Sequence, residues 1–192
     1  MRELIITENI TIDGVIDASE GWFVPSGSDD EHDAAELAKV QQEHMSGADA
    51  VLLGRVTYQE FEDYWPKQAD DQTGISDYLN NVTKYVVSGT LSNPTWQHTT
   101  VLRGPLLDEV AALKAEPGQA IVTTGSIQLV QALVPSGLVD EYRLWVYPVA
   151  LGYGRRLFQN RPDQPDLRLV EARPFGSGIV LMRYRAEPKR GG

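Results

Sequence analysis

The feature that most constrains the fold is an alternation of short apolar runs with helical segments over the first two thirds of the chain. A helix that connects two strands allows them to run parallel, so this pattern predicts a mainly parallel sheet with helices on both faces. The last third shows longer strands with no helix between them, which predicts antiparallel strands added at one edge. Strands are expected at residues 3–7, 50–53, 85–87, 101–102, 120–123, 139–147, 167–173 and 179–185, and helices at about 30–45, 56–64, 77–82, 105–115 and 127–133.

We expect one three-layer α/β/α domain over residues 1–192, because no linker, repeat or low-complexity tract divides the chain and its length is ample for one buried core. Hydrophobic residues make up 42% and charged residues 23%, which is ordinary for a soluble globular protein. No apolar run approaches the roughly 20 residues of a membrane span. Acidic residues also interrupt the N-terminal stretch where a signal peptide would be apolar. We expect a cytoplasmic protein without a membrane segment.

The formal net charge of −10 argues against general affinity for nucleic acid, which requires a positive surface. Residues 1–77 hold 18 acids and 4 bases, whereas residues 78–192 hold 9 acids and 13 bases. A phosphorylated ligand would therefore find most of its positive charge in the second part. The absence of cysteine excludes disulfides and thiolate ligands. The histidines lack metal-ligand spacing, so we expect no metal and surface positions for His32, His44 and His98.

Three apolar strands end in a small polar tripeptide, at residues 53–55, 87–89 and 124–126. Ligands of open α/β sheets bind at the carboxyl ends of parallel strands, where glycine lets the backbone approach and helix N–H groups face anions. Helices that begin at Gly54 and Gly125 could hold the two phosphates of a dinucleotide. Each glycine alone is equally consistent with an ordinary turn, and the three strand ends together favour a ligand site.

Polar side chains beside these strand ends suit phosphate. Arg55 offers a planar guanidinium, although an ion pair with Glu60 or Asp63 is an alternative role. Hydroxyl and guanidinium groups for a ribose 2′-phosphate follow at Ser88, Thr90 and Arg103.

Five segments in this order make the chain similar to a known family. It resembles the dihydrofolate reductase superfamily, and within it the group related to the reductase domain of bacterial riboflavin biosynthesis. The resemblance extends over roughly residues 3–185. The matching segments are Thr-Ile-Asp-Gly-Val-Ile at 11–16, Asp-Ala-Val-Leu-Leu-Gly-Arg-Val-Thr-Tyr at 49–58, Val-Thr-Thr-Gly-Ser at 122–126, Gly-Leu-Val-Asp-Glu-Tyr-Arg-Leu at 137–144, and Pro-Val-Ala-Leu-Gly-Tyr-Gly-Arg-Arg-Leu-Phe at 148–158.

This resemblance implies an NADPH-dependent reductase of a small heterocyclic substrate, similar to the phosphoribosylaminouracil reductase of riboflavin biosynthesis or to dihydrofolate reductase. It implies walls around the nicotinamide from Asn9, Ile16 and Asp17, and flanking of the ribose 2′-phosphate by Arg103. It assigns the cofactor phosphates to Gly54, Arg55, Val56, Thr57, Ser88, Gly89, Thr90, Gly125, Ser126, Ile127, Gln128 and Leu129.

The substrate side is expected to be built from five aromatic side chains, one leucine and one arginine: Trp22, Leu37, Phe61, Trp65, Arg143, Trp145 and Tyr147. Asp33 on the first helix is the candidate proton donor, with an ordered water as an equal alternative and helix capping as a structural one. Residues 21–25 are apolar where the riboflavin reductases hold a ribose phosphate, and we expect no companion deaminase domain. We expect residues 13–22 to act as a lid.

Two other classes of function fit the same sequence: a catalytically silent dinucleotide-binding module, and an interaction protein that has kept the fold. We also expect a homodimer through the antiparallel edge, around Leu138–Leu151 or Leu167–Tyr184. Finally, we expect Gly125→Val to spare the fold while it removes the cofactor.

Overall fold

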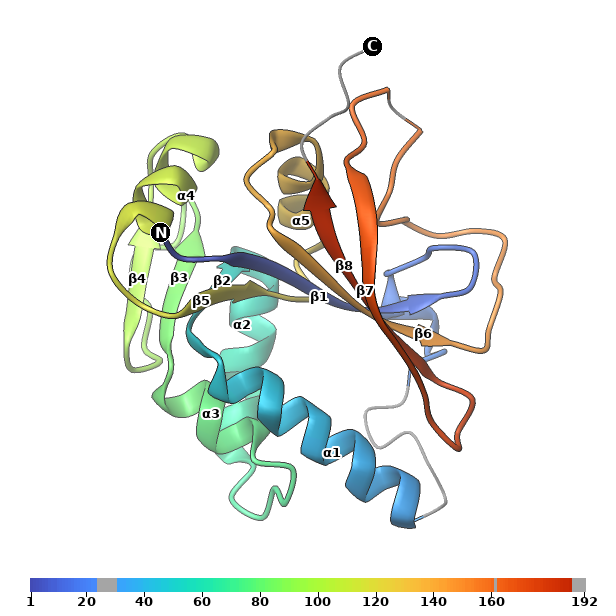
Figure 1. The fold of residues 1–192 in the computed structure, drawn as a ribbon. Helices are drawn as coiled ribbons and strands as arrows, with labels where there is room; N and C mark the ends of the chain where they lie inside the picture. Colours follow the sequence, from blue (N-terminus) through green and yellow to red (C-terminus); the bar gives the residue numbers. More distant parts are fainter. Residues whose placement is uncertain (24–30, 161, 188–192) are drawn as a thin grey trace.

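The protein forms one eight-stranded mixed sheet with helices on both faces (Figure 1). This computed structural model describes residues 1–23, 31–160 and 162–187. The order of the strands is β4-β3-β2-β5-β1-β6-β8-β7. The first six are mutually parallel, whereas β8 pairs antiparallel with both β6 and β7. The α/β class, the mainly parallel sheet and the antiparallel C-terminal strands are therefore confirmed.

The predicted elements are found close to their expected places. The strands are β1 (Leu4–Thr11), β2 (Ala48–Gly54), β3 (Thr83–Val87), β4 (Thr99–Leu102), β5 (Ala120–Thr123), β6 (Glu141–Tyr147), β7 (Asp166–Pro174) and β8 (Val180–Glu187). The helices are α1 (Glu31–Ser46), α2 (Arg55–Tyr64), α3 (Ile75–Asn81), α4 (Leu106–Ala115) and α5 (Ile127–Leu133). The proposed N-caps of α1, residues 28–30, lie outside the described residues. No helix in the described parts is long and apolar enough to span a membrane.

The core divides into layers because the apolar side chains of the strands point alternately to the two faces of the sheet. Leu4, Ile6 and Leu52 pack against α4 and α5 on one face. Val51 and Leu53 pack against α2 and α3 on the other, where α1 covers Trp145 and Leu181 further along the sheet. This arrangement is the three-layer α/β/α architecture expected from the alternating pattern.

Strand β1 is longer than predicted, and its extra residues open a gap in the sheet. β1 pairs with β5 only from Leu4 to Ile6, which lies opposite Thr123. It continues alongside β6 as far as the pair Thr11–Tyr147. Beyond Ile6, the edge of β1 that faced β5 therefore has no strand beside it in the described sheet. The carboxyl ends of β2 and β5 lie at the same opening.

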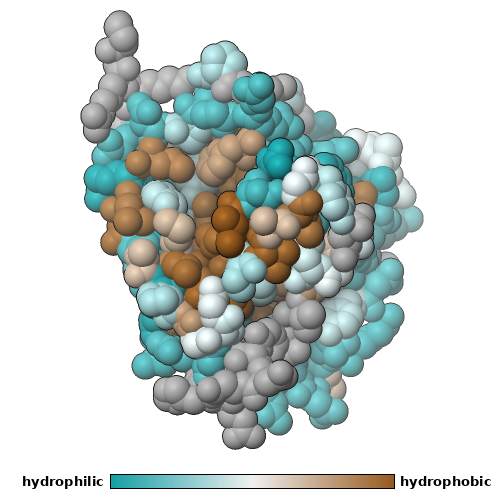
Figure 2. All heavy atoms as spheres, turned by 90° about the vertical axis from the view of Figure 1, so that its right-hand side faces the viewer, coloured by the Kyte–Doolittle hydropathy of each residue, from teal (hydrophilic) through white to brown (hydrophobic). Residues whose placement is uncertain are grey.

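The antiparallel edge carries exposed apolar side chains. Leu169 and Val170 lie on β7, the outermost strand of the sheet, and are 49% and 45% exposed. Figure 2 shows one face of the molecule, on which apolar side chains gather in the middle and hydrophilic ones surround them. β6 lies between β1 and β8, so the segment Leu138–Leu151 does not offer a free strand edge. Of the two edges proposed for a homodimer, the one formed by β7 remains.

Candidate active site

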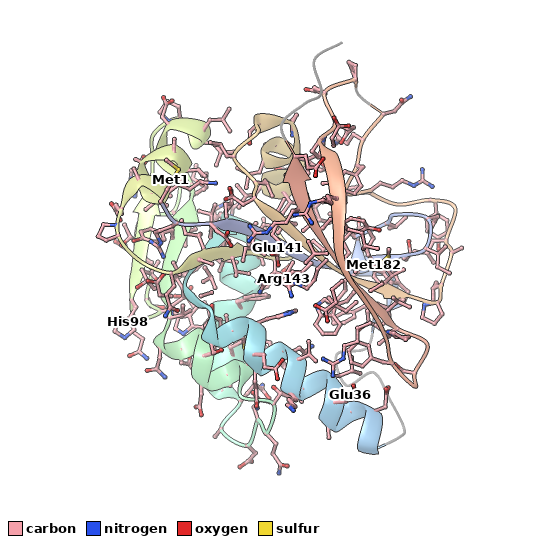
Figure 3. The ribbon with its side chains drawn as sticks, in the orientation of Figure 1. Met1, Glu36, His98, Glu141, Arg143 and Met182 are labelled. Atoms are coloured by element: carbon pink, nitrogen blue, oxygen red, sulfur yellow. The ribbon has the colours of Figure 1, made fainter. Side chains whose placement is uncertain are left out.

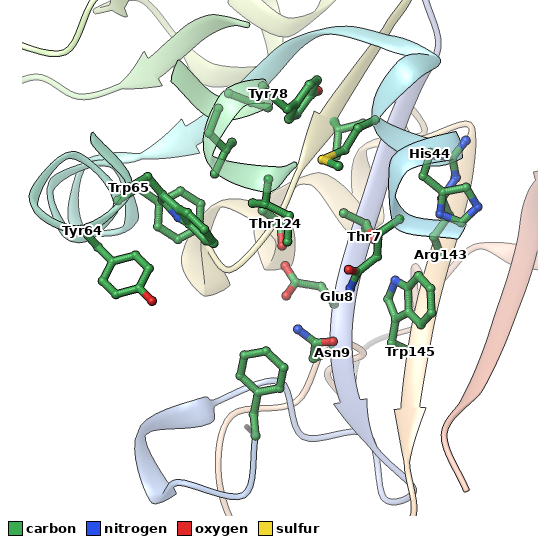
Figure 4. Close-up of a pocket in the computed structure, with 18 of the residues that line it drawn as sticks. Thr7, Glu8, Asn9, His44, Tyr64, Trp65, Tyr78, Thr124, Arg143 and Trp145 are labelled. Carbon is green, nitrogen blue, oxygen red and sulfur yellow. The ribbon is translucent and has the colours of Figure 1, made fainter. Parts of the chain in front are cut away.

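A cavity of about 500 Å³ lies at the opening of the sheet, between β1, β5 and β6 on one side and α1, α2 and α3 on the other. Figure 4 shows aromatic side chains around most of it and a few polar groups directed inward. The lining residues are Thr7, Glu8, Asn9, Phe23, Gln41, His44, Met45, Val51, Glu60, Phe61, Tyr64, Trp65, Ile75, Tyr78, Leu79, Val122, Thr124, Arg143, Trp145 and Tyr147. A concave, mainly apolar cavity with few polar groups is typical of a small-molecule site.

Glu8 is the polar group that the sequence analysis missed. It is 4% exposed, and its Oε1 atom has no hydrogen-bond partner among the described residues. Burial raises the pKa of Glu8 to about 8, and a hydrogen bond from the backbone N–H of Gly125 offsets this only in part. Glu8 is therefore largely protonated at neutral pH. It is a buried acid that faces a cavity and can donate a proton there.

The sequence does contain a signal for this residue. Ile6, Glu8 and Ile10 alternate along β1, so all three point to the same face of the sheet. Ile6 and Ile10 belong to the core on that face, and Glu8, between them, lines the cavity where β5 no longer pairs with β1. A glutamate between two core positions is costly to bury and indicates a functional group. The strand expected from the sequence ends at residue 7, so Glu8 lies just beyond it.

The strand ends of β2 and β5 meet, as the proposed dinucleotide site requires. The backbone N–H of Gly54 donates a hydrogen bond of 2.9 Å to Ser126 Oγ. A β-carbon on Gly125 would lie 3.4 Å from Cγ2 of Thr57. Gly54, Thr57, Gly125 and Ser126 thus form one surface, although they come from two segments about 70 residues apart in the sequence.

The backbone conformation of Gly125 bears on the expected effect of Gly125→Val. Its φ is 65°, in the left-handed region that favours glycine. The substitution Gly125→Val therefore strains the backbone of the folded protein whether or not a cofactor binds. The positive φ fits the alternative role of Gly125 as an ordinary turn glycine and argues that this variant destabilises the apo protein.

The α5 helix begins with two N–H groups that have local partners. Ser126 N donates to Thr124 O and Ile127 N donates to Gly125 O. For Gln128 and Leu129, the described residues supply no acceptor to the backbone N–H, so these two groups remain open to a ligand.

Arg55, one of the proposed phosphate-binding residues, has a single side-chain hydrogen bond. Arg55 is exposed and donates to Gln59 Oε1 at 2.7 Å, not to Glu60 or Asp63 as the alternative role required. Its neighbour Val56 is 58% exposed. Arg55 can leave this single contact at little cost, so it is available to an anion.

The loop after β3 is organised by two of the expected cofactor residues. Ser88 Oγ accepts hydrogen bonds from the N–H groups of Thr90 and Leu91. Arg103 donates to the carbonyl of Leu91 at 2.6 Å and to that of Gly89 at 3.5 Å. Ser88 and Arg103 therefore hold the loop in shape, while Gly89 and Thr90 are exposed at its tip.

The proposed lid is attached to the segment that follows β6. Asp13 accepts a hydrogen bond from Gly152 N at 2.7 Å, and Val15 forms a bridge with Arg156. Asp17 forms a 2.7 Å ion pair with Arg155, whose hydrogen bond lowers the pKa of Asp17 to about 2. Ile16 is buried, while Asn9 reaches the cavity from β1. Residues 13–17 are thus anchored, and any movement must break these contacts.

Five of the seven expected substrate residues line the cavity, namely Phe61, Trp65, Arg143, Trp145 and Tyr147. Trp22 is not a lining residue, but its ring lies 5.5 Å from that of Tyr147 in an edge-to-face contact. Leu37 packs in the cluster between α1 and the sheet.

Asp33 is not among the lining residues. It is buried, and its carboxylate accepts hydrogen bonds from the backbone N–H groups of Gly176 and Ser177 in the β7–β8 turn. Asp33 therefore attaches α1 to this turn. Glu8 replaces it as the candidate proton donor.

His44 also departs from the expectation. It is partly buried and lines the cavity, where its ring lies 6.0 Å from that of Trp145, so a surface position is wrong. His98 is exposed, as expected, and the side chain of His32 lies outside the described residues. Within the described ranges, no group of three or more His, Asp or Glu side chains is placed to hold a metal.

The fold defines a dihydrofolate-reductase-like α/β domain with a cavity at its strand ends. Residues 2–181 match the model of the RibD C-terminal domain, and the chain belongs to this reductase-like family.

The chain is similar over almost its whole length to two proteins of Bacillus subtilis (strain 168). The uncharacterized protein YyaP is 30% identical over 188 residues, which cover 95% of this chain and 94% of YyaP. The uncharacterized protein YwjB is 26% identical over 188 residues, covering 96% of this chain and 99% of YwjB.

Solved structures of similar fold include a putative riboflavin biosynthesis protein from Shewanella sp. PV-4. Its TM-score is 0.69 at 18% identity, with 97% of this chain and 99% of that chain covered. A pyrimidine reductase-like protein from Corynebacterium diphtheriae has a TM-score of 0.64 at 17% identity, with coverage of 98% and 93%. At this level of identity, the two structures support the fold alone.

Proposed function

We propose that the protein is an NADPH-dependent reductase of a small planar heterocycle and that Glu8 supplies the proton. The observation that carries the proposal is the buried carboxyl of Glu8, which has an unpartnered oxygen and lies beside Gly125 at the opening of the sheet. Membership of a reductase-like family supports the reaction class.

The residues at the strand ends fit a dinucleotide. Gly54 and Gly125 bring bare backbone to one surface, and the N–H groups of Gln128 and Leu129 are open to a phosphate. Arg55 would contact a phosphate through its guanidinium, and the exposed tip of the β3 loop at Gly89 and Thr90 would face the ribose 2′-phosphate. Asn9 and Glu8 line the adjoining cavity, on the side where the nicotinamide would lie.

The chemistry divides between cofactor and protein. When bound, the cofactor supplies a hydride, the two electrons of the reduction. Glu8 holds a proton at its carboxyl and donates it to the nitrogen or oxygen of the substrate's reducible double bond, which leaves a carboxylate that water reprotonates. The aromatic walls orient the substrate and exclude water. Because the side chain of Glu8 is buried, its proton is retained near neutral pH.

The cavity favours a small flat substrate over a phosphoribosyl compound. Arg143 is the one lysine or arginine among the described lining residues, whereas seven of the lining side chains are aromatic rings of Phe, Tyr or Trp. A ribose phosphate would need more donors than one arginine offers. The substrate of riboflavin biosynthesis is therefore the weaker candidate for this chain.

Two measurements test the proposal. NADPH and NADH are titrated by protein fluorescence, and NADPH oxidation is then followed with a panel of pterins, pyrimidines and quinones. A reductase binds NADPH more tightly than NADH and oxidises it with at least one compound class. Binding without oxidation across the panel would identify a silent dinucleotide-binding module. Absence of binding would identify an interaction module.

A further inference from the structure

One end of the cavity is polar, and Arg143 is its main group. The side chain of Arg143 is 12% exposed, and its Nε donates to Glu141 Oε1 at 2.6 Å. Its two terminal nitrogens have no hydrogen-bond or ion-pair partner in the part of the chain that the structure describes. Because Arg143 also lines the cavity, these terminal N–H groups are available to a ligand.

Arg143 shares its carboxylate partner with two other guanidinium groups. Its partner Glu141 is 2% exposed and lies within 3.1 Å of Arg183 and 3.5 Å of Arg185 as well. Burial opposes ionisation of Glu141, but its hydrogen bonds with Arg183 and Arg143 lower the pKa below the usual value. One carboxylate is thus shared among three guanidinium groups. Figure 3 shows Glu141 and Arg143 together on β6.

Arg183 and Arg185 have further carboxylate partners outside the cavity, whereas Arg143 has Glu141 alone among the described residues. Arg183 pairs with Glu171 at 3.0 Å, and Arg185 pairs with Glu3 at 2.6 Å. The three guanidinium groups and the three carboxylates balance in number, so Arg143 is distinguished by its terminal N–H groups, which have no partner among the described residues, and by its position in the lining of the cavity.

Two neutral polar groups, His44 and Tyr78, line the same cavity. Burial and the nearby charge of Arg143 lower the pKa of His44 to about 4, so its imidazole is uncharged at neutral pH. Burial and the charge of Asp49 raise the pKa of Tyr78 to about 12, and the charge of Arg143 offsets part of this rise. The hydroxyl of Tyr78 is buried without a hydrogen-bond partner among the described residues. A buried unpaired hydroxyl is costly unless a ligand satisfies it.

We propose that Arg143, with His44 and Tyr78, forms a carboxylate subsite, and that the substrate is a planar aromatic or heteroaromatic carboxylate. The guanidinium fork matches the geometry of a carboxylate in a bidentate pair. Trp145 lies beside this end, with its ring against His44, and provides an apolar surface for the ring that carries the carboxylate. This subsite deepens the proposed function, because it names the substrate class for the same cavity.

The test uses a matched pair of ligands that differ only in charge. Naphthoate and its neutral analogue naphthamide are titrated into the protein without cofactor, near pH 6.5, where Glu8 is largely protonated, and binding is read from quenching of tryptophan fluorescence. We expect wild-type protein to bind naphthoate at least about tenfold more tightly than naphthamide. Arg143→Gln should abolish this preference, while Arg143→Lys should retain part of it.

Arg183→Gln is the matched control, since it removes a guanidinium from the same ion-pair cluster but not from the lining of the cavity. This variant should keep the wild-type preference for naphthoate. Equal affinity of wild-type protein for the two ligands would overturn the subsite, as would a preference that persists in Arg143→Gln. Because no cofactor or turnover is involved, failure here leaves the reductase proposal standing, and failure of NADPH binding leaves the subsite standing.

Discussion

Glu8 and Gly125 are joined by a hydrogen bond from the backbone N–H of Gly125 to the Glu8 carboxyl. Each residue lies two positions beyond Ile6 and Thr123, the last pair of β1 and β5. The hydrogen bond therefore crosses the gap at which the two strands separate. It places the candidate proton donor at the strand end that is expected to meet the cofactor, so the acid and the cofactor site depend on the same loop.

The raised pKa of Glu8 predicts a pH dependence of stability. Between the ordinary pKa of 4.5 and about 8, the folded protein retains a proton that the unfolded chain releases. The free energy of unfolding should therefore fall as pH rises through this window. In Glu8→Gln, the fall between about pH 5 and about pH 9 should be smaller, by an amount on the order of a few kcal/mol.

Chemical unfolding of the two proteins at several pH values measures this difference. Glu60→Gln is the control, because Glu60 also lines the cavity but is exposed, and it should keep the wild-type pH dependence. Parallel curves for wild type and Glu8→Gln would show that the Glu8 carboxyl is not desolvated.

Arg55→Ala should weaken NADPH binding with little effect on the apo protein. Arg55 is exposed and has a hydrogen bond to Gln59, so its removal costs the fold little. Loss of a charge-assisted phosphate contact should reduce NADPH affinity by about 1.5–3 kcal/mol. Gln59→Ala removes the partner alone and should bind NADPH normally. Fluorescence titrations in which Arg55→Ala matches wild type would remove Arg55 from the cofactor site.

Gly125→Val should destabilise the apo protein. Its φ of 65° costs a residue with a β-carbon about 1–2 kcal/mol, and a branched side chain more. Gly89→Val is a suitable control, because no atom lies within 4 Å of its added β-carbon and its φ is outside the positive region. Thermal unfolding without ligand should show a lower Tm for Gly125→Val than for Gly89→Val. Equal values would indicate that the loop at Gly125 relaxes freely.

The exposed edge of β7 predicts a homodimer. Leu169 and Val170 are about half exposed on the outermost strand, and such an edge normally requires cover. Light scattering should give twice the mass of one chain for wild type. The double substitution Leu169→Lys and Val170→Lys should give a monomer, because each introduces a charge at the edge. A monomeric wild-type protein at micromolar concentration would rule out this assembly.

Much of the fold could be predicted because local pattern and turn chemistry agreed. Helix α4 illustrates this agreement: Pro105 precedes it, Asp108 and Glu109 occupy its first turn, and Pro117-Gly118 follows its end. The aromatic residues of the cavity were found through the resemblance of the chain to a family. The end of β1 could not be predicted in this way, because Glu8 and Asn9 resemble loop residues until their pairing with β6 is known.

The errors at the site come from contacts between residues distant in sequence. Asp33 has the position of an acid on the first helix, but Gly176 and Ser177, more than 140 residues later, capture its carboxylate. His44 lies against Trp145, and its pKa is lowered by burial and by the charge of Arg143, both residues of β6. No local pattern records these pairings. The α-helical period or the strand period indicates which face a residue occupies, and not which group will meet it.

The rate of NADPH oxidation by wild type and by Glu8→Gln, measured against pH with the most active compound of the panel, tests the central claim most directly. If Glu8 donates the proton, the wild-type rate should fall as pH rises through about 8, because the acid loses its proton. Glu8→Gln should be slower by about 10²–10⁴-fold at lower pH, with the fall near pH 8 abolished. A Glu8→Gln protein with the wild-type rate and pH profile would contradict the account.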